Sequence, residues 1–375
     1  MKKIISLLSL SVLFSCQPKT EESETEKAEP VKELTLLVGT YTKRDSEGIY
    51  MIKFNPETGD FREVGVTGDI EDPSFLALSP DKKYVYSVSE IGGGSVYAYA
   101  LGDSSLNFIN STSSGGVHPC HIAVDKTGKW VFTGNYSDGS LAVLPILENG
   151  GVGKFVQAIK HTGSGPNKDR QKEPHVHSVN VSPNNQDIYV PDLGIDKVMA
   201  YRFNDSTGTL TEGNSVAVSA GSGPRHFTFH PNGKYAYVVQ ELTGKVTAFK
   251  YSDNTLETIE EVSTLPEGFE GKNSSADIHI SPDGKFLYAS NRFHDSIVIF
   301  EIDQKTGKLQ QVSHHSVLGQ MPRNFGITPN GKFLLVANQE TDNIVIFERD
   351  AESGKISPTG KEIPVSMPVC LLFID

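Results

Sequence analysis

The sequence is poor in basic residues. Its 375 residues include 34 Lys and Arg against 46 Asp and Glu, which gives a formal net charge of −12 at pH 7. Proteins that bind nucleic acid rely on positive charge to neutralise the phosphates. The charge balance therefore argues against nucleic acid as a partner.

Cysteine is also scarce, with three residues at positions 16, 120 and 370. Cys120 and Cys370 fall in units of an internal repeat that we expect to be non-adjacent, so we predict no disulfide between them. The chain has no G-x-S-x-G nucleophile motif and no glycine-rich dinucleotide motif after a strand. We therefore predict no cofactor.

Two closely spaced histidine pairs are the only hint of a metal site. They are His118 with His121 and His175 with His177. The second pair is two residues apart, so its side chains share a face if the segment is extended. No convergent set of carboxylates and cysteines accompanies either pair, and we predict no metal ion.

Long apolar segments are missing after the first 15 residues. Within these, Lys2 and Lys3 precede an apolar stretch over residues 4–14, and Ser15 and Cys16 follow, which is the form of a bacterial lipoprotein signal. The stretch is too short to span a membrane as a mature helix. We predict a signal peptide over 1–15, a lipid anchor on Cys16, and an exported periplasmic or cell-envelope lipoprotein that meets the membrane only through this anchor.

The next segment, residues 16–33, is rich in Glu, Lys, Thr and Pro and almost free of apolar residues. Such a composition cannot bury a core, so we predict a disordered tether. Loss of Lys2 and Lys3 with the signal peptide changes the net charge from −12 to −14.

What the sequence does contain is a repeat of roughly fifty residues. Short runs rich in Tyr, Val and Phe, such as 84–88 and 235–239, indicate an all-β chain. Turns of the type S-P-D or H-P-N-G recur at 79–81, 125–128, 182–184, 230–233, 281–284 and 328–331. Proline presets one turn angle, and Asn-Gly or Asp-Gly supplies the positive one. The spacing of these turns is the length of a four-stranded propeller blade.

The two ends of the chain complement each other. Residues 368–373 provide only the first strand of a unit, whereas residues 34–66 provide the other three. The six units marked by turns and this shared unit make seven units in total. We predict an all-β, seven-bladed β-propeller over residues 34–375, whose ring is closed by a C-terminal strand that completes the N-terminal blade.

Polar side chains gather at two kinds of position that share one face of such a ring: those that lead into each first strand and those that end each second strand. These positions differ between units, whereas the strand cores and turns stay alike, which is typical of a binding site. They include His121, His177, Arg225, His226, Glu241, Asn291, Arg292, Arg323 and Asn338.

Arginines and histidines clustered in an acidic protein favour a small anionic ligand at this face. The alternative is that the arginines only pair with Glu90, Asp192 and Glu241 to neutralise the channel. The insertion between Gly150 and Pro174 makes the third interval between turns the longest, and it contains Lys154, Lys160, Lys168, Asp169 and Arg170. This insertion is either a lid over the site or an ordinary surface loop.

From about residue 34 to the C-terminus, the chain resembles the lactonase family of seven-bladed propellers, which includes propeller-type 6-phosphogluconolactonases and carboxy-muconate lactonizing enzymes. The resemblance lies in the segments 37–41 (LVGTY), 118–121 (HPCH), 174–177 (PHVH), 223–226 (GPRH), 290–292 (SNR) and 322–324 (PRN). The residues that the family is proposed to use in catalysis correspond to His177, Arg225, Glu241 and Arg292. Gln240 precedes Glu241 where the family usually has Asn.

The resemblance implies a metal-free lactonase, a carboxylic ester hydrolase that acts on an anionic sugar lactone or sugar acid. Glu241 or His177 would take a proton, while Arg225 and Arg292 would hold a carboxylate and stabilise the oxyanion. The substrate-binding residues would be His121, His175, His226, Arg323, Asn291 and Asn338. The export signal conflicts with 6-phosphogluconolactone itself, which arises in the cytoplasm.

Two other functions remain open from the sequence. One is a non-catalytic exported propeller that binds sugar acids or a protein through the same face. The other is a cycloisomerase that forms or opens an unsaturated acid lactone. The repeat positions that line this face contain few aromatic residues besides Phe75 and Tyr136, which favours an enzyme over a protein-binding scaffold.

Overall fold

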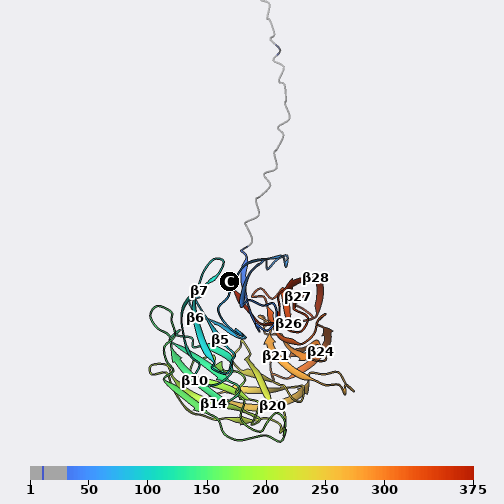
Figure 1. Ribbon diagram of the computed structural model, residues 1–375. Coiled ribbons are helices and arrows are strands. Elements are labelled where there is room, and N and C mark those ends of the chain that lie inside the picture. The colour runs from blue at the N-terminus through green and yellow to red at the C-terminus, as the bar shows by residue number, and fades with distance from the viewer. Residues whose placement is uncertain (1–10, 12–31) are drawn as a thin grey trace, which may run out of the picture. The chain divides into compact units, whose positions relative to one another are not determined.

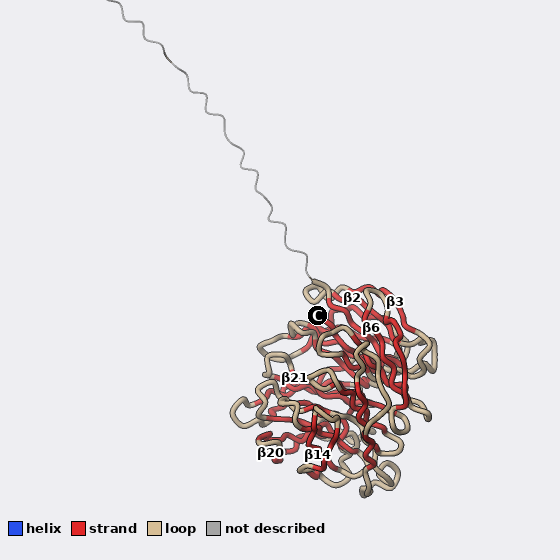
Figure 2. Tube along the Cα trace, turned by 90° about the vertical axis from the view of Figure 1, so that its left-hand side faces the viewer, coloured by secondary structure: helices blue, strands red, loops and turns tan. Residues whose placement is uncertain are grey.

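The computed structural model describes Ser11 and residues 32–375. The predicted anchor residue Cys16 and nearly all of the predicted signal peptide and tether lie outside the described residues. Residues 32–375 form one compact unit of 29 strands, and Figure 2 shows only strands and loops in its coloured part. The described part of the chain has no helix long and apolar enough to cross a membrane.

The strands form seven antiparallel sheets, which are the blades. Each blade is written from the channel outward. Blade 1 contains β29 (Pro368–Ile374), β1 (Leu34–Thr40), β2 (Ile49–Phe54) and β3 (Phe61–Thr67), and blade 2 contains β4 (Leu76–Leu78), β5 (Tyr84–Ser89), β6 (Ser95–Leu101) and β7 (Leu106–Ser113). Blade 3 contains β8 (Pro119–Val124), β9 (Trp130–Asn135), β10 (Ser140–Pro145) and β11 (Gln157–Lys160). Blade 4 contains β12 (Asn180–Val181), β13 (Asp187–Asp192), β14 (Lys197–Asn204) and β15 (Thr209–Glu212), and β16 (Val216–Ala217) also pairs with β14.

Blades 5 to 7 follow the same order. They are β17 (Pro224–Phe229), β18 (Tyr235–Gln240), β19 (Lys245–Ser252) and β20 (Thr255–Ser263); β21 (Ser274–Ile280), β22 (Phe286–Arg292), β23 (Ser296–Ile302) and β24 (Leu309–Ser316); and β25 (Pro322–Ile327), β26 (Phe333–Asn338), β27 (Asn343–Arg349) and β28 (Ile356–Pro364).

The ring closes as predicted. β29 pairs with β1 in blade 1, with Leu372 opposite Leu37, and it contacts the inner strands β25 and β4 of the two neighbouring blades. Figure 1 shows the blue start and the red end of the coloured chain next to each other. The sequence prediction of an all-β, seven-bladed propeller closed by its C-terminal strand is therefore confirmed.

The core is divided among the interfaces between blades. Seven clusters of buried apolar side chains each join two neighbouring blades, and one of them joins blade 7 to blade 1. The second strands of the blades are covered on both faces, so their sequences are mostly apolar rather than alternating. In β18 every residue is buried.

The repeated turns have the backbone geometry that their sequence predicts. Gly128, Gly233, Gly284 and Gly331 all have φ near +70°, which costs glycine little. The two copies without glycine place Lys82 (φ 59°) and Asn185 (φ 61°) at the same position. The turn geometry is thus kept in all six copies, even where the residue is unfavourable.

Candidate active site

The candidate site lies at the end of the channel where the inner strands begin and the second strands end. In β8, β17, β21 and β25 the pairing register shifts one or two residues after the strand starts. A β-bulge bends the strand and redirects its side chains. The residues at these irregularities include Cys120, Arg225, Ala276 and Arg323, so the same local distortion supplies polar groups from several blades.

Glu241, which follows β18, is the centre of the site. Its Oε1 accepts a hydrogen bond from Arg170 Nη2 at 2.6 Å, and its Oε2 lies 2.9 Å from Arg292 Nη2. Arg225 Nε lies 3.0 Å from Oε2 but lacks the alignment of a hydrogen bond. His177 Nε2 is 3.9 Å from the same oxygen. The structure thus brings together the four residues that the family resemblance singles out.

The neighbouring arginines stabilise the ionised form of Glu241. Burial alone raises the pKa of this carboxyl, but Arg292, Arg225 and Arg170 outweigh burial and lower the pKa to about 2. Burial lowers the pKa of Arg292 to about 9, which leaves its guanidinium protonated at neutral pH. Glu241 and the arginines are therefore a charged cluster at neutral pH.

Arg170 is the site residue that the sequence did not single out. It belongs to the insertion between Gly150 and Pro174, and it also donates to Tyr136 Oη at 3.2 Å. The neighbouring Gln171 is buried and donates to Leu193 O at 2.8 Å and Asp196 Oδ1 at 2.7 Å, which fixes the insertion on blade 4. The only signals in the sequence were the extra length of this step and its basic residues.

A second cluster surrounds Asp277 in β21. Its carboxylate accepts hydrogen bonds from His226 Nδ1 at 2.7 Å, His279 Nε2 at 2.9 Å and Asn324 Nδ2 at 2.5 Å. The sequence places His226 at the site but predicts no role for Asp277. Asp277 occupies the same position in blade 6 that His226 occupies in blade 5, which is the signal that could have identified it.

The histidines near the channel are buried and packed against one another. His121 stacks on Phe75 at 4.1 Å, and the rings of His177 and His226 are 5.6 Å apart. Burial lowers the pKa of His121 and of His177 well below the usual value. His175 lies at the rim, where it stacks on Tyr136 at 4.4 Å and its Nδ1 donates to Tyr136 O.

Four of the six predicted substrate-binding residues do not line the cavity beside Arg225 and Arg323: His121 and His175 lie as described above, and Asn291 and Asn338 bond to groups between strands. Asn291 bonds Ser275 and Ser296 of blade 6 and Thr264 in the loop between β20 and β21. Asn338 donates to Val317 O. Both side chains are fully buried, because they complete the hydrogen bonding of loops between strands.

A cavity of about 10 Å³, room for about one water molecule, opens between these clusters. Its lining is Ser74, Phe75, Glu90, Cys120, Arg225, His226, Arg323 and Val369. Burial raises the pKa of the Cys120 thiol, so it stays protonated and is a weak nucleophile at neutral pH. Within residues 32–375, no cluster of three His, Cys, Asp or Glu side chains is arranged for a metal ion.

Arg323 is the cation of this cavity with the least compensation. Its guanidinium lies 5.3 Å from the ring centre of Tyr41, whose hydroxyl donates to Glu90 Oε2 at 2.9 Å. No carboxylate of the described residues lies within 4.0 Å of Arg323. It is therefore available to an anionic ligand.

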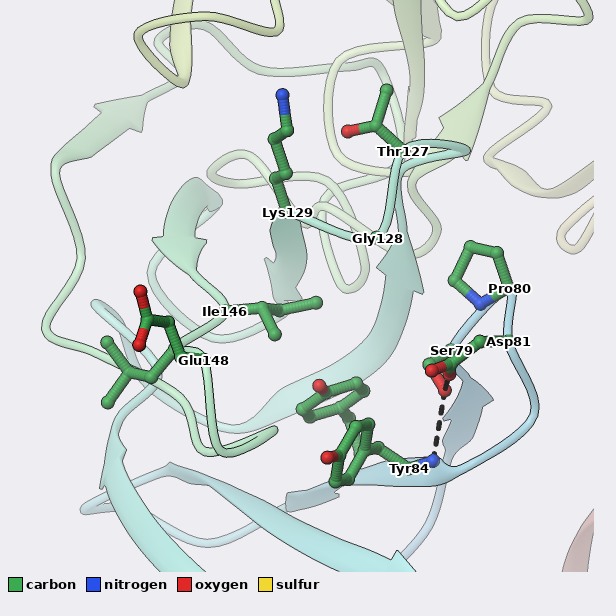
Figure 3. A pocket seen from close by; sticks show the side chains of 11 residues that line it. Ser79, Pro80, Asp81, Tyr84, Thr127, Gly128, Lys129, Ile146 and Glu148 are labelled. Atoms are coloured by element: carbon green, nitrogen blue, oxygen red, sulfur yellow. Dashed lines mark hydrogen bonds between the residues drawn. The ribbon is translucent and has the colours of Figure 1, made fainter.

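A larger cavity of about 380 Å³ lies between the turns of blades 2 and 3, at the opposite ends of the inner strands (Figure 3). Ser79 Oγ accepts a hydrogen bond from Tyr84 N there, and Tyr86 Oη donates to Gly150 O. Lys129 and Glu148 are its charged lining residues besides Asp81. These contacts hold the turns together, and the cavity has no cluster of convergent catalytic groups.

The chain matches the family described as lactonase, 7-bladed beta-propeller, over residues 35–373. It belongs to this lactonase family. It is 39% identical over 293 residues to a 6-phosphogluconolactonase of Bacillus subtilis, a match that covers 77% of this chain and 83% of the relative. It is 41% identical over 303 residues to a 6-phosphogluconolactonase of Formosa agariphila, with 78% and 86% covered.

Solved structures agree with the family assignment. The periplasmic gluconolactonase of Pseudomonas aeruginosa is 34% identical to this chain and superposes with a TM-score of 0.88, with 92% of this chain and 99% of the other covered. The lactonase family therefore supplies both the fold and the reaction class to be considered for this site.

Proposed function

We propose that this protein is a lactonase that hydrolyses an anionic sugar lactone at the channel mouth. The observation that carries the choice of an anion is the local charge. Four guanidinium groups, those of Arg170, Arg225, Arg292 and Arg323, face three carboxylates, Glu90, Glu241 and Asp277, an excess of one positive charge in a protein of net negative charge. The similarity to lactonases that act on gluconolactone or its 6-phosphate supports the reaction class.

In lactone hydrolysis, water attacks the carbonyl carbon, and negative charge develops on the carbonyl oxygen. Buried guanidinium groups that are fixed before the reaction stabilise such a charge. We assign this role to Arg225 and Arg292, because both are buried and Glu241 fixes their positions. Arg323 is left to bind the anionic group of the substrate.

Glu241 is better suited to holding the arginines than to taking a proton. A carboxylate with a pKa of about 2 is a weak base at neutral pH. We therefore place the proton transfer on a histidine rather than on Glu241. The cavity of about 10 Å³ is smaller than a sugar ring, so substrate binding requires the Arg170 segment or rim side chains to move.

The decisive experiment is a panel of lactones assayed with the purified full-length protein: glucono-δ-lactone, its 6-phosphate and a glucaro-lactone, which carries a carboxylate. We expect hydrolysis of the charged lactones above that of the neutral one. Binding of sugar acids without turnover would instead support the non-catalytic propeller, and turnover of muconate alone would support the cycloisomerase.

We also propose that the protein is exported and attached to the cell envelope through Cys16. The N-terminal sequence supports this location, and so does the similarity to a periplasmic gluconolactonase. Cell fractionation after labelling with a fatty acid tests it. The label and the membrane association should both be lost in Cys16→Ala.

A further inference from the structure

Asp277 accepts five hydrogen bonds, which fixes the protons around it. Besides its three side-chain partners, Ile278 N donates to Oδ1 at 2.9 Å and Phe325 N lies 3.3 Å from Oδ2. The amide of Asn324 has one orientation, because its Oδ1 accepts from Leu371 N at 2.7 Å, so its Nδ2 must donate to Asp277. Asp277 is therefore an ionised carboxylate that only accepts.

This carboxylate determines the tautomer of His226. A carboxylate that only accepts requires a proton on Nδ1 of His226, at 2.7 Å. In the neutral imidazole the other nitrogen, Nε2, then carries a lone pair. The ring of His226 lines the cavity together with Arg225, Arg323 and Glu90. The imidazole of His226, with its proton fixed on Nδ1, thus borders the cavity in which the anionic substrate is proposed to bind.

No comparable partner orients His177. Its Nε2 is 3.9 Å from Glu241, whose charge is already shared among three arginines, and its Nδ1 is 3.8 Å from the Cys120 thiol. Neither contact has the length of a strong hydrogen bond. His121 has the opposite tautomer to His226, because its Nδ1 accepts from Val179 N at 3.3 Å.

We infer that His226 is the general base of the lactonase and that Asp277 is a positioning residue that fixes its tautomer. This inference rests on the proposed function. Nε2 takes a proton from water while the water oxygen bonds to the carbonyl carbon, and the carbonyl π electrons move to its oxygen. When the tetrahedral intermediate collapses, the ring C–O bond breaks and Nε2 returns the proton to the leaving oxygen. Lactone and water become one hydroxy acid.

The surroundings of His226 set the pH range of this step. Burial and then Arg225 lower the pKa of His226 to about 4, while Asp277 opposes them and His279 adds to the lowering. The rings of His121, His177 and Phe75 are its other close neighbours. His226 is thus neutral near pH 7, and a bound anion offsets the charge of Arg225 and makes the imidazole more basic. We expect kcat/KM to fall as the pH drops through about 4.

The test compares three variants of the full-length protein on the best lactone of the panel. His226→Asn keeps a donor near the position of Nδ1 but has no second nitrogen, and Asp277→Asn no longer fixes the tautomer. Both should lower kcat by about 10²–10⁴-fold with little change in KM. His315→Gln is the control, because it removes an imidazole of the outer strand β24 that bonds Ser313 outside the site, and its kcat should change less than about threefold.

The outcomes separate the two claims. Full activity in His226→Asn would overturn the general-base assignment and leave the lactonase function standing. An equal loss in a folded His315→Gln variant would overturn it too, because the loss would then not be specific to the Asp277 cluster. Thermal unfolding of each variant identifies such folding defects, and in a folded Asp277→Asn variant the acid limb of the kcat/KM profile should shift. A wild-type protein inactive on every lactone would overturn the proposed function itself.

Discussion

Arg170 Nη2 and Glu241 Oε1 lie 2.6 Å apart, although 71 residues separate them in the chain. The contact joins the insertion of blade 4 to the centre of the site in blade 5. The Arg170 side chain is 41% exposed, whereas that of Glu241 is 4% exposed. The insertion therefore covers the carboxylate from the solvent side, which favours its interpretation as a lid over that of an ordinary surface loop.

Replacing Arg170 should weaken substrate binding more than chemistry. In Arg170→Ala we expect KM for a charged lactone to rise about tenfold, which corresponds to about 1.4 kcal/mol, with kcat changed less than about threefold. Steady-state kinetics measure both constants. Lys168→Ala, which removes an exposed positive charge from the same insertion, is the control and should leave KM unchanged. Equal effects of the two substitutions would contradict a specific role for Arg170.

Glu241→Gln should destabilise the fold as well as the site. The substitution leaves Arg225 and Arg292 buried without their counter-ion, a defect that costs about 3–5 kcal/mol. Chemical denaturation measures the loss. Glu261→Gln removes the partner of Lys245 at a more exposed pair and should cost no more than about 1 kcal/mol. A Glu241 variant as stable as the control would contradict the buried charge cluster.

Arg323 should select for substrate charge. In Arg323→Ala we expect kcat/KM for a phosphorylated or carboxylated lactone to fall about 100-fold, because the cavity loses its uncompensated cation. The value for neutral glucono-δ-lactone should change less than about fivefold. The ratio of the two specificity constants is the measurement, and an equal fall for both substrates would place the substrate anion elsewhere.

Protonation of Glu241 at low pH should lower the free energy of unfolding. Its pKa is about 2 in the folded protein and near 4.5 in the unfolded chain, so the folded state binds the proton less readily. The resulting stability is fully present above pH 4.5 and is lost as the pH falls through about 2. Unfolding free energies measured between pH 6 and pH 2 should fall more steeply in the wild type than in Glu241→Gln. Parallel curves would show that Glu241 is not the group responsible.

The fold could be predicted from sequence because it depends on repeated, local features. The proline turns reveal the unit, and the split unit at 34–66 and 368–373 reveals the closure. The same chemistry at each turn gives the same backbone geometry, even where Lys82 and Asn185 replace glycine. A pattern repeated six times outweighs the exceptions in single copies.

The site was only partly predictable, because its contacts cross between blades. The positions that lead into the inner strands placed Arg225 and His226 on the correct face, but a single sequence does not reveal which neighbour an arginine pairs with. Arg170 was missed because it comes from a non-repeated segment. Asn291 shares its position in the repeat with Asn135 and Asn338, and the structure assigns it to loop hydrogen bonds instead.

β29 contributes to more than closure of the ring. It follows every other strand in the chain, and its residue Val369 lines the cavity beside Arg323 and His226. Leu371 in the same strand orients Asn324, which in turn bonds Asp277. The strand that closes the ring therefore also completes the site. A chain without residues 368–375 would lack both the strand that closes the ring and part of the cavity lining, so loss of this one strand should abolish closure and activity together.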